Sequence, residues 1–208
     1  MEGAWEFLFA HEITGYHVDT QVPAPQWCRP KRGGRPGQVE QAVLDLHVQG
    51  PPDDPERYLD VAVRHPVGDV AEEELRLRGS QDGRTARQEE ASKRGRYPAS
   101  RCAARMTPLV HETYGRMGPA ALQYLRQLAR ARVARDPELQ VGGAWAAPAL
   151  LQRWIGILAV ALQRANVASV QWACGAWGQC PPVRGSVPQP YEPFAERVPG
   201  GPQSEGLD

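Results

Sequence analysis

Two short stretches, Val43-Leu-Asp-Leu-His-Val48 and Tyr58-Leu-Asp-Val-Ala-Val63, decide the fold of this chain. In each stretch apolar residues flank a single aspartate in a pattern typical of β-strands, and a Gly-Pro-Pro sequence at 50–52 ends the first. Strands joined by such a short acidic connection are expected to pair antiparallel as a hairpin. We therefore expect Asp45 and Asp60 to lie on neighbouring strands, where they can share one site.

The residues around this hairpin predict an α/β fold with a short mixed sheet flanked by helices. The Pro-, Gly- and Arg-rich segment 21–37 is expected to be an extended loop. After the hairpin, the sequence predicts helices over 70–78 and 84–95, a strand over 106–112, a helix that opens at Pro119, and a helix over 148–173.

This order of elements suggests four segments along the chain. Residues 1–37 form an N-terminal helix and extended segment, and 38–135 form the core. Residues 136–175 are expected to be a C-terminal helical extension. The Pro-, Gly- and Ser-rich segment 176–208 lacks periodicity and is predicted to be a disordered tail.

The helix over 148–173 carries an apolar stripe along one side. Its members are Leu150, Leu151, Trp154, Ile155, Leu158, Leu162 and Val167. Such a stripe is typical of packing against the core or a partner. The longest uninterrupted apolar run, at 155–162, is too short to span a bilayer, so we expect no membrane association.

Charge and cysteine content restrict the classes of function. The 24 basic and 24 acidic residues give a formal net charge of zero, so any nucleic-acid binding must come from local patches. We expect Arg84, Arg87, Arg94 and Arg96 to contact the phosphate backbone of DNA. The ordinary alternative is that such residues lie on solvated helix faces. The four cysteines form no CxxC pair and are too scattered for a disulfide scaffold, which favours a reducing compartment over secretion. A soluble nuclear or cytoplasmic location is expected only on the basis of a DNA substrate.

Asp45 and Asp60 are candidate metal ligands. Each interrupts an apolar strand, where a buried carboxylate without compensation would be costly. Carboxylates on adjacent strands supply the hard oxygen ligands that Mg²⁺ prefers, and a divalent ion can activate water for phosphodiester cleavage. The alternative is that the aspartates point to solvent or cap a turn. His47 shares the strand face of Asp45, and a packing or surface role is its ordinary use.

A helical trio adds a possible ammonium group to this site. Glu89, Lys93 and Tyr97 are spaced four apart and share one face if the helix reaches Tyr97. Beside the hairpin, Lys93 could hold the attacking water or stabilise the phosphate. The alternative is a surface pair of Glu89 and Lys93 that stabilises the helix by roughly a few tenths of a kcal/mol.

This arrangement resembles the PD-(D/E)XK superfamily, in particular the restriction-like endonuclease at the C-terminal end of non-LTR retrotransposon reverse transcriptase polyproteins. The resemblance covers about 43–135. Two stretches are also similar to segments of such polyproteins: Tyr58-Leu-Asp-Val-Ala-Val-Arg-His-Pro66 and Pro108-Leu-Val-His-Glu-Thr-Tyr-Gly115.

The resemblance implies Asp45 and Asp60 as Mg²⁺ ligands, Lys93 as the catalytic lysine and Tyr97 as its neighbour. It gives no support to Glu89. The sequence departs from the family in two places. Leu44 stands where the family often has proline, and Ala62 occupies the lysine position of the simplest D-x-K arrangement. Lys93 must therefore supply the ammonium that Ala62 cannot.

The family usually carries a zinc knuckle upstream of this region. Here His11, His17 and Cys28 precede the core without the spacing of ligand pairs, so we expect no structural zinc.

Three functions remain open from the sequence. The first is a Mg²⁺-dependent DNA endonuclease that nicks a target strand. The second is a catalytically inactive remnant that binds nucleic acid or a protein partner. The third is an unrelated small α/β domain whose two strand aspartates are coincidental.

Overall fold

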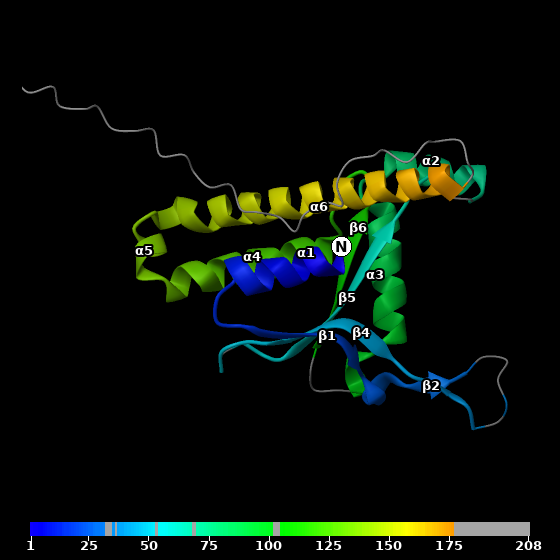
Figure 1. Ribbon diagram of the computed structural model, residues 1–208, viewed down its shortest axis with the longest axis horizontal. Helices are drawn as coiled ribbons and strands as arrows, with labels where there is room; N and C mark the ends of the chain where they lie inside the picture. Colours follow the sequence, from blue (N-terminus) through cyan, green and yellow to red (C-terminus); the bar gives the residue numbers. More distant parts are fainter. Residues whose placement is uncertain (32–34, 36, 53, 68–69, 102–104, 177–208) are drawn as a thin grey trace, which may run out of the picture. The chain divides into compact units, whose positions relative to one another are not determined.

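The computed structural model describes residues 1–31, 35, 37–52, 54–67, 70–101 and 105–176. It confirms the predicted α/β class, with a four-stranded mixed sheet and several helices (Figure 1). The chain divides into two units, Met1–Ser169 and Val170–Asp208. Within the second unit, 170–176 are described, as the end of a helix. The tail predicted for 176–208 lies outside the described residues from 177 onward.

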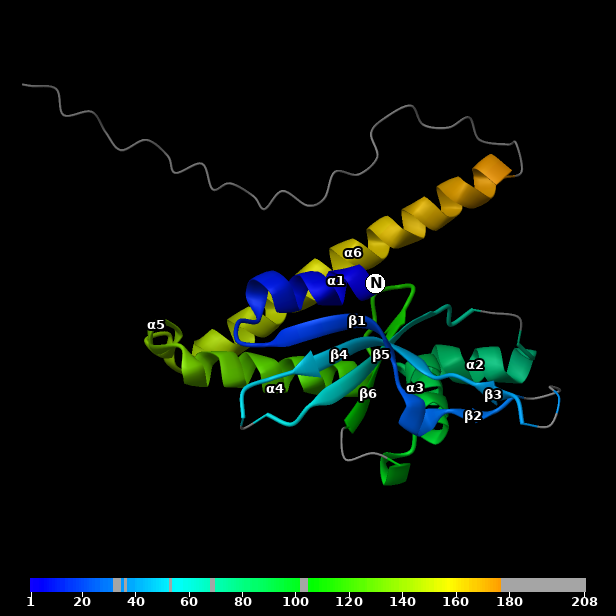
Figure 2. The same cartoon turned by 60° about the horizontal axis from the view of Figure 1, so that its bottom comes forward.

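The sheet is formed by four strands in the order β1-β4-β5-β6, which Figure 2 shows side by side. These strands are β1 (His17–Pro23), β4 (Val43–Gln49), β5 (Arg57–Arg64) and β6 (Arg105–Glu112). Strands β1, β4 and β5 pair antiparallel, whereas β6 runs parallel to β5. The predicted hairpin of β4 with β5 is therefore confirmed.

Strand β1 is a departure from the sequence-based prediction. Gln21 to Pro23 end this strand instead of opening an extended loop. The chain then forms a 3₁₀ turn, η2 (Pro25–Trp27), and a small ribbon in which β2 (Arg29–Pro30) pairs with β3 (Val39–Glu40). An edge strand needs less apolar surface than a central one, which explains the weak apolar pattern of β1.

Helices precede, connect and follow the strands. The N-terminal helix α1 (Glu2–Phe7) continues as the π-helical turn η1 (Leu8–Glu12). The connection from β5 to its parallel partner contains α2 (Glu72–Ser80), α3 (Arg84–Arg96) and the 3₁₀ turn η3 (Ala99–Arg101). After β6 come α4 (Pro119–Arg135), α5 (Pro137–Gln140), η4 (Gly143–Trp145) and α6 (Ala146–Ala176). Each predicted helix is thus present, and α2 begins and ends two residues later than expected.

Two buried glutamates complete the N-termini of helices that lack a capping side chain of their own. Glu112 of β6 accepts a hydrogen bond from the Ala86 N–H in the first turn of α3, at 3.2 Å. Glu90 of α3 accepts one from the Ala120 N–H of α4, at 2.9 Å. Each carboxylate satisfies an otherwise unpaired helix donor and lies at the positive end of the helix dipole.

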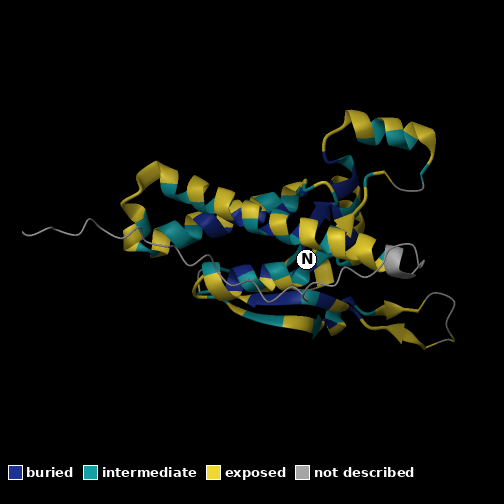
Figure 3. Cartoon of the chain, turned by 45° about the horizontal axis from the view of Figure 1, so that its top comes forward, coloured by how far each residue is buried: buried dark blue, intermediate teal, exposed yellow. Residues whose placement is uncertain are grey.

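The main hydrophobic core joins α1, η1, the sheet, α4 and α6, and Figure 3 shows buried residues on their facing sides. Its buried members are Trp5, Leu8, Phe9, Ile13, Leu46, Val48, Leu59, Leu109, Ala121, Tyr124, Leu125, Leu128, Ala129, Trp154 and Leu158. A smaller cluster consists of Ala24, Trp27, Ala42 and Leu44, with Tyr58, Tyr97 and Met106 packed against it.

Helix α6 follows its predicted stripe through the first part of its length. Trp154, Leu158 and Leu162 are buried at a spacing of four residues. Val167 is 55% exposed and does not pack against the core, so for this residue the predicted packing against a partner stays a prediction. By length and composition the stretch Gly143–Ala173, with a mean hydropathy of 1.4, could also cross a membrane, a property shared by core helices of soluble proteins. The absence of membrane association therefore stays a prediction.

Candidate active site

Asp45 and Asp60 lie next to each other where the pairing of β4 with β5 ends. The ladder runs from Val48↔Arg57 to Leu46↔Leu59, so the next position sets Asp45 opposite Asp60. There Asp45 Oδ2 accepts a hydrogen bond from the Val61 N–H at 2.6 Å. A side-chain carboxylate thus takes a strand donor, and its charge strengthens the bond.

Lys93 reaches this point from α3, which packs against β5 and β6. Its Nζ lies 2.5 Å from Asp60 Oδ1, and the two side chains are only 6% and 12% exposed. The ammonium therefore lies directly beside the Asp60 carboxylate. The attraction within this buried pair is opposed by the cost of removing both charges from water.

Asp60 is not fully paired by this contact. Its second oxygen, Oδ2, is buried and has no hydrogen-bond partner among the described residues. Buried carboxylate oxygens are nearly always satisfied, because leaving one unpaired costs roughly 1–3 kcal/mol. The unpaired oxygen therefore marks a position where a cation, a water molecule or a substrate donor can bind.

The environment raises the pKa of Asp45 above its usual range. Burial is the largest cause, and the negative charges of Asp60 and Glu2 act in the same direction. The Val61 N–H and the Lys93 ammonium oppose this shift. Three carboxylates and one ammonium are thus close enough to influence one another, and perturbed pKa values of this kind cluster at functional sites.

Glu2 is the member of this group that the sequence did not indicate. Gln21 of β1 donates hydrogen bonds from Nε2 to both Glu2 carboxylate oxygens, each at 2.9 Å. Gln21 has a positive φ of 51° and lies between residues paired with Leu46 and Leu44, across from Asp45. An acid in the first turn of a helix is ordinary, so no sequence signal separated Glu2 from a dipole-stabilising residue.

Helix α3 ends at Arg96, so Tyr97 follows it as a non-helical cap residue and does not continue the helical face predicted from the spacing. Its ring packs against Trp27, with centroids 5.8 Å apart. Burial, followed by the charge of Asp60, raises the pKa of its hydroxyl. Tyr97 is therefore within the electrostatic reach of the site, while its ring belongs to the smaller core cluster.

Glu89 does not pair with Lys93, although both lie on α3 four residues apart. Its carboxylate instead lies 2.9 Å from the Arg64 guanidinium on β5. The alternative of a surface Glu-to-Lys pair is therefore wrong for this helix, because Lys93 turns inward to Asp60.

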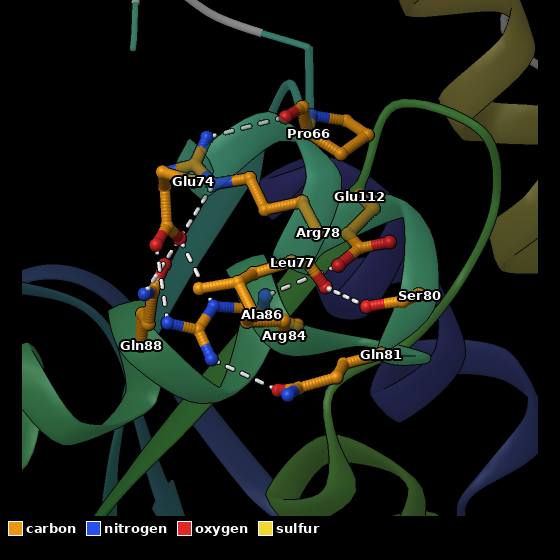
Figure 4. Close-up of polar contacts among 10 residues, drawn as sticks. All are labelled: Pro66, Glu74, Leu77, Arg78, Ser80, Gln81, Arg84, Ala86, Gln88 and Glu112. Carbon is orange, nitrogen blue, oxygen red and sulfur yellow. Dashed lines mark hydrogen bonds and ion pairs between the residues drawn. The ribbon is translucent and has the colours of Figure 1, made fainter. Parts of the chain in front are cut away.

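The four arginines that we expect to contact DNA have different environments. Arg84 donates to both carboxylate oxygens of Glu74, at 3.0 and 3.1 Å, and Figure 4 shows this bidentate pair. Arg94 lies 3.4 Å from the buried Glu90, and Arg96 lies over the Tyr97 ring. Arg87 is exposed. Arg84 would have to leave Glu74 in order to bind a phosphate, whereas Arg87 is accessible as it stands.

His47 makes its contacts away from Lys93. Its Nε2 bonds to Glu56, its Nδ1 lies 3.5 Å from Asp19, and its ring stacks on Tyr58 with centroids 4.5 Å apart. These contacts hold the imidazole against the strand surface, in keeping with the packing role.

The two carboxylates suit Mg²⁺, which keeps water and substrate ligands, better than a metal ion whose ligands all come from the protein. No group of three His, Cys, Asp or Glu side chains in the described part of the chain is arranged to hold a metal ion. Mg²⁺ is usually held by one or two carboxylates together with waters and substrate phosphates. Asp45 and the unpaired Oδ2 of Asp60 would supply those carboxylate oxygens.

Comparisons of the chain with protein-family models, curated proteins and solved structures give no significant match. The geometry of the site and the sequence resemblance are therefore the basis for assigning a function.

Proposed function

We propose that this chain is a Mg²⁺-dependent DNA endonuclease domain with a restriction-endonuclease-like core. The observation that carries the proposal is the meeting of Asp45, Asp60 and Lys93 at one point of the sheet. Two carboxylates come from neighbouring strands and the ammonium comes from the following helix, in the order that the resemblance implies. The buried and unpaired Oδ2 of Asp60 gives this group a free ligand position.

The roles of the residues follow from their charges and positions. A bound Mg²⁺ would supply an activated water and neutralise negative charge that develops on the phosphate. Asp45 and Asp60 would hold the ion, and the Val61 N–H keeps Asp45 in place. Lys93 would donate hydrogen bonds to the attacking water or to a phosphate oxygen, acting from a site that largely excludes solvent.

Nicking of supercoiled DNA tests the proposal. The purified chain is expected to convert supercoiled DNA to the open circular form when Mg²⁺ is present and to stop when EDTA is added. Asp60→Asn removes the ligand charge at nearly constant volume, so we expect at least about a thousandfold loss of rate, roughly 4 kcal/mol.

Asp82→Asn is the matched control, because Asp82 is 92% exposed and contacts the Arg116 guanidinium at 2.7 Å, away from the candidate site. This variant is expected to nick DNA at the rate of the unaltered chain. Equal activity in Asp60→Asn and the unaltered chain would contradict the proposal.

The second candidate is a domain that keeps the fold without catalysis and binds nucleic acid or a protein partner. It is favoured by the direct contact of Lys93 with Asp60, which is also how a purely structural ion pair would look. This candidate predicts no Mg²⁺-dependent nicking in the assay above. In gel-shift experiments, it predicts retarded migration of DNA.

A further inference from the structure

A cavity of about 290 Å³ lies beside the site, between the end of β5 and helices α2 and α3. It is lined by Arg64, His65, Arg78, Thr85, Gln88 and Glu89. Pockets for drug-like molecules are mostly apolar and occupy about 300–1,000 Å³. This cavity is slightly smaller than that range and is lined by polar and charged side chains, so it suits a small charged group.

Thr85 lines this cavity and carries a buried hydroxyl without a hydrogen-bond partner in the described part of the chain. The residue is only 7% exposed, and its Oγ1 has no hydrogen-bond partner among the described residues. It lies in the first turn of α3, a 13-residue helix without a capping side chain of its own. A hydroxyl at the positive end of a helix is well placed to donate to an anion.

Two guanidinium groups in the cavity are held in position and keep unused donors. Arg64 contacts Glu89 through Nη2 at 2.9 Å. Arg78 contacts Glu74 through Nε at 3.1 Å and donates from Nη1 to the Pro66 carbonyl at 3.2 Å (Figure 4). A guanidinium has five N–H donors, so these bonds leave donors on both side chains for a ligand. Fixed arginines of this kind suit phosphate oxygens.

The cavity is adjacent to the candidate active site on two elements. On β5, Arg64 lies four residues beyond Asp60, a distance of about 13 Å along a strand. On α3, Glu89 lies one turn before Lys93, about 6 Å along the helix axis. A single nucleic-acid strand can therefore pass both places.

We propose that this cavity binds a phosphate group of the same nucleic-acid strand that the Asp45, Asp60 and Lys93 site acts on. This inference rests on the proposed function for the identity of the strand. Binding of the phosphate itself depends only on the cavity. Arg64, Arg78 and Thr85 donate to the phosphate oxygens, and Glu89 opposes binding because it competes for Arg64.

Titration of the full chain with inorganic phosphate, followed by NMR of backbone amides, tests the cavity without any cleavage. We expect saturable shifts at Thr85 and His65. Arg64→Gln and Thr85→Val should each weaken binding by roughly tenfold, because each removes a donor to a charged group. Glu89→Gln should strengthen binding, because it frees Arg64. Arg76→Gln makes the same charge change on α2 outside the cavity and should have no effect.

The absence of saturable shifts, or equal affinity in Arg64→Gln, Thr85→Val and Arg76→Gln, would overturn the inference. Gel-shift binding of a single-stranded oligonucleotide then separates nucleic acid from a free phosphate. Arg64→Gln should lower the magnitude of the slope of log affinity against log salt by about 0.7, the value for one phosphate contact on a single strand. An unchanged slope together with weakened binding of inorganic phosphate would instead assign the cavity to a small phosphorylated ligand.

The Asp60→Asn variant makes failure of the cavity distinguishable from failure of the proposed function. It should lose Mg²⁺-dependent nicking while it keeps phosphate binding and the salt slope of the unaltered chain. If nicking is absent from every variant but Arg64→Gln still changes the salt slope, the strand contact stands and the endonuclease proposal fails.

Discussion

Two regions of the molecule bury carboxylates in different ways. At the N-termini of α3 and α4, Glu112 and Glu90 are buried, and each accepts a backbone N–H bond from a helix. At the end of the β4–β5 pairing, Asp60 is buried beside Lys93 and keeps one oxygen without a partner. In the first region the carboxylates accept hydrogen bonds from helix N-termini. In the second, one carboxylate oxygen of Asp60 is free to accept a further ligand.

The difference separates structural acids from candidate functional ones more sharply than burial does. Glu90, Glu112 and Asp60 are all at least nine-tenths buried. What distinguishes them is that Glu90 and Glu112 each accept a backbone N–H bond from a helix, whereas Asp60 contacts the Lys93 ammonium and keeps one buried oxygen unpaired among the described residues. Substitutions in the two regions should therefore respond differently to cations, to volume and to pH.

The largest effect on stability is expected at Lys93. Lys93→Met leaves the buried Asp60 carboxylate without its ion pair and should lower the free energy of unfolding by about 3 kcal/mol in chemical denaturation. Mg²⁺ should raise the melting temperature of this variant more than that of the unaltered chain, because the ion replaces the missing charge. Lys31→Met, at an exposed lysine, is the control. Equal stability of both variants would remove the distinction between the regions.

A smaller loss is expected from filling the space beside Glu90. Gly118→Ala would place a Cβ onto Glu90 Oε1 and 3.3 Å from the Val110 carbonyl, so we expect a loss of about 1–3 kcal/mol. Gly95→Ala, in an open position of α3, should instead stabilise the chain by roughly 0.5–1 kcal/mol. Adding Glu90→Ala should relieve most of the clash at Gly118. A loss that persists in this double variant would show that Glu90 does not limit the space there.

The dependence of stability on pH sharpens the comparison at Glu90. Burial raises the pKa of this carboxyl above its unfolded value, although the Ala120 N–H and Arg94 oppose the shift. The folded state therefore favours the protonated acid. The stability that protonated Glu90 contributes is lost as the pH rises through the raised pKa. Glu90→Gln keeps an acceptor for Ala120 and cannot ionise. Relative to the unaltered chain, this variant should gain stability between pH 4 and pH 7 in denaturation curves, and a constant difference across that range would contradict the assignment.

The smallest effect is expected at an ion pair that belongs to neither region. Arg76 and Glu72 lie 2.6 Å apart on α2, with side chains 78% and 80% exposed. Arg76→Ala should change the free energy of unfolding by less than about 0.5 kcal/mol, because solvent and salt screen such pairs. A larger change would mean that exposed ion pairs stabilise this chain as much as buried ones do. The expected difference between Lys93 and Arg76 would then be contradicted.

The central hairpin could be predicted because its pattern is local. Alternation around Asp45 and Asp60 and the short turn between the strands determine both the pairing and the register. Strand β1 escaped prediction because His17, Asp19 and Gln21 give it a polar alternate face and Pro23 ends it within a loop-like composition. The parallel partnership of β5 with β6 depends on packing of the crossover helices, which the sequence pattern alone does not specify.

The candidate site shows the same limit. The spacing of Lys93 placed it on a helix near the hairpin, but its contact with Asp60 and not with Glu89 is a result of how α3 packs on the sheet. Glu2 was missed because its influence on Asp45 depends on where α1 lies against the sheet, next to Gln21 of the unpredicted strand β1. Cavities such as the one around Thr85 arise from residues of β5, α2 and α3 together and leave no short motif.

The parallel pairing of β5 with β6 also has a consequence for the order in which the chain folds. The β4–β5 hairpin closes a short loop and can form early, whereas β6 can join only after the long α2–α3 connection is in place. Until α3 docks, the two aspartates lack the Lys93 ammonium. Docking of the crossover therefore adds a positive charge that partly offsets the repulsion between Asp45 and Asp60.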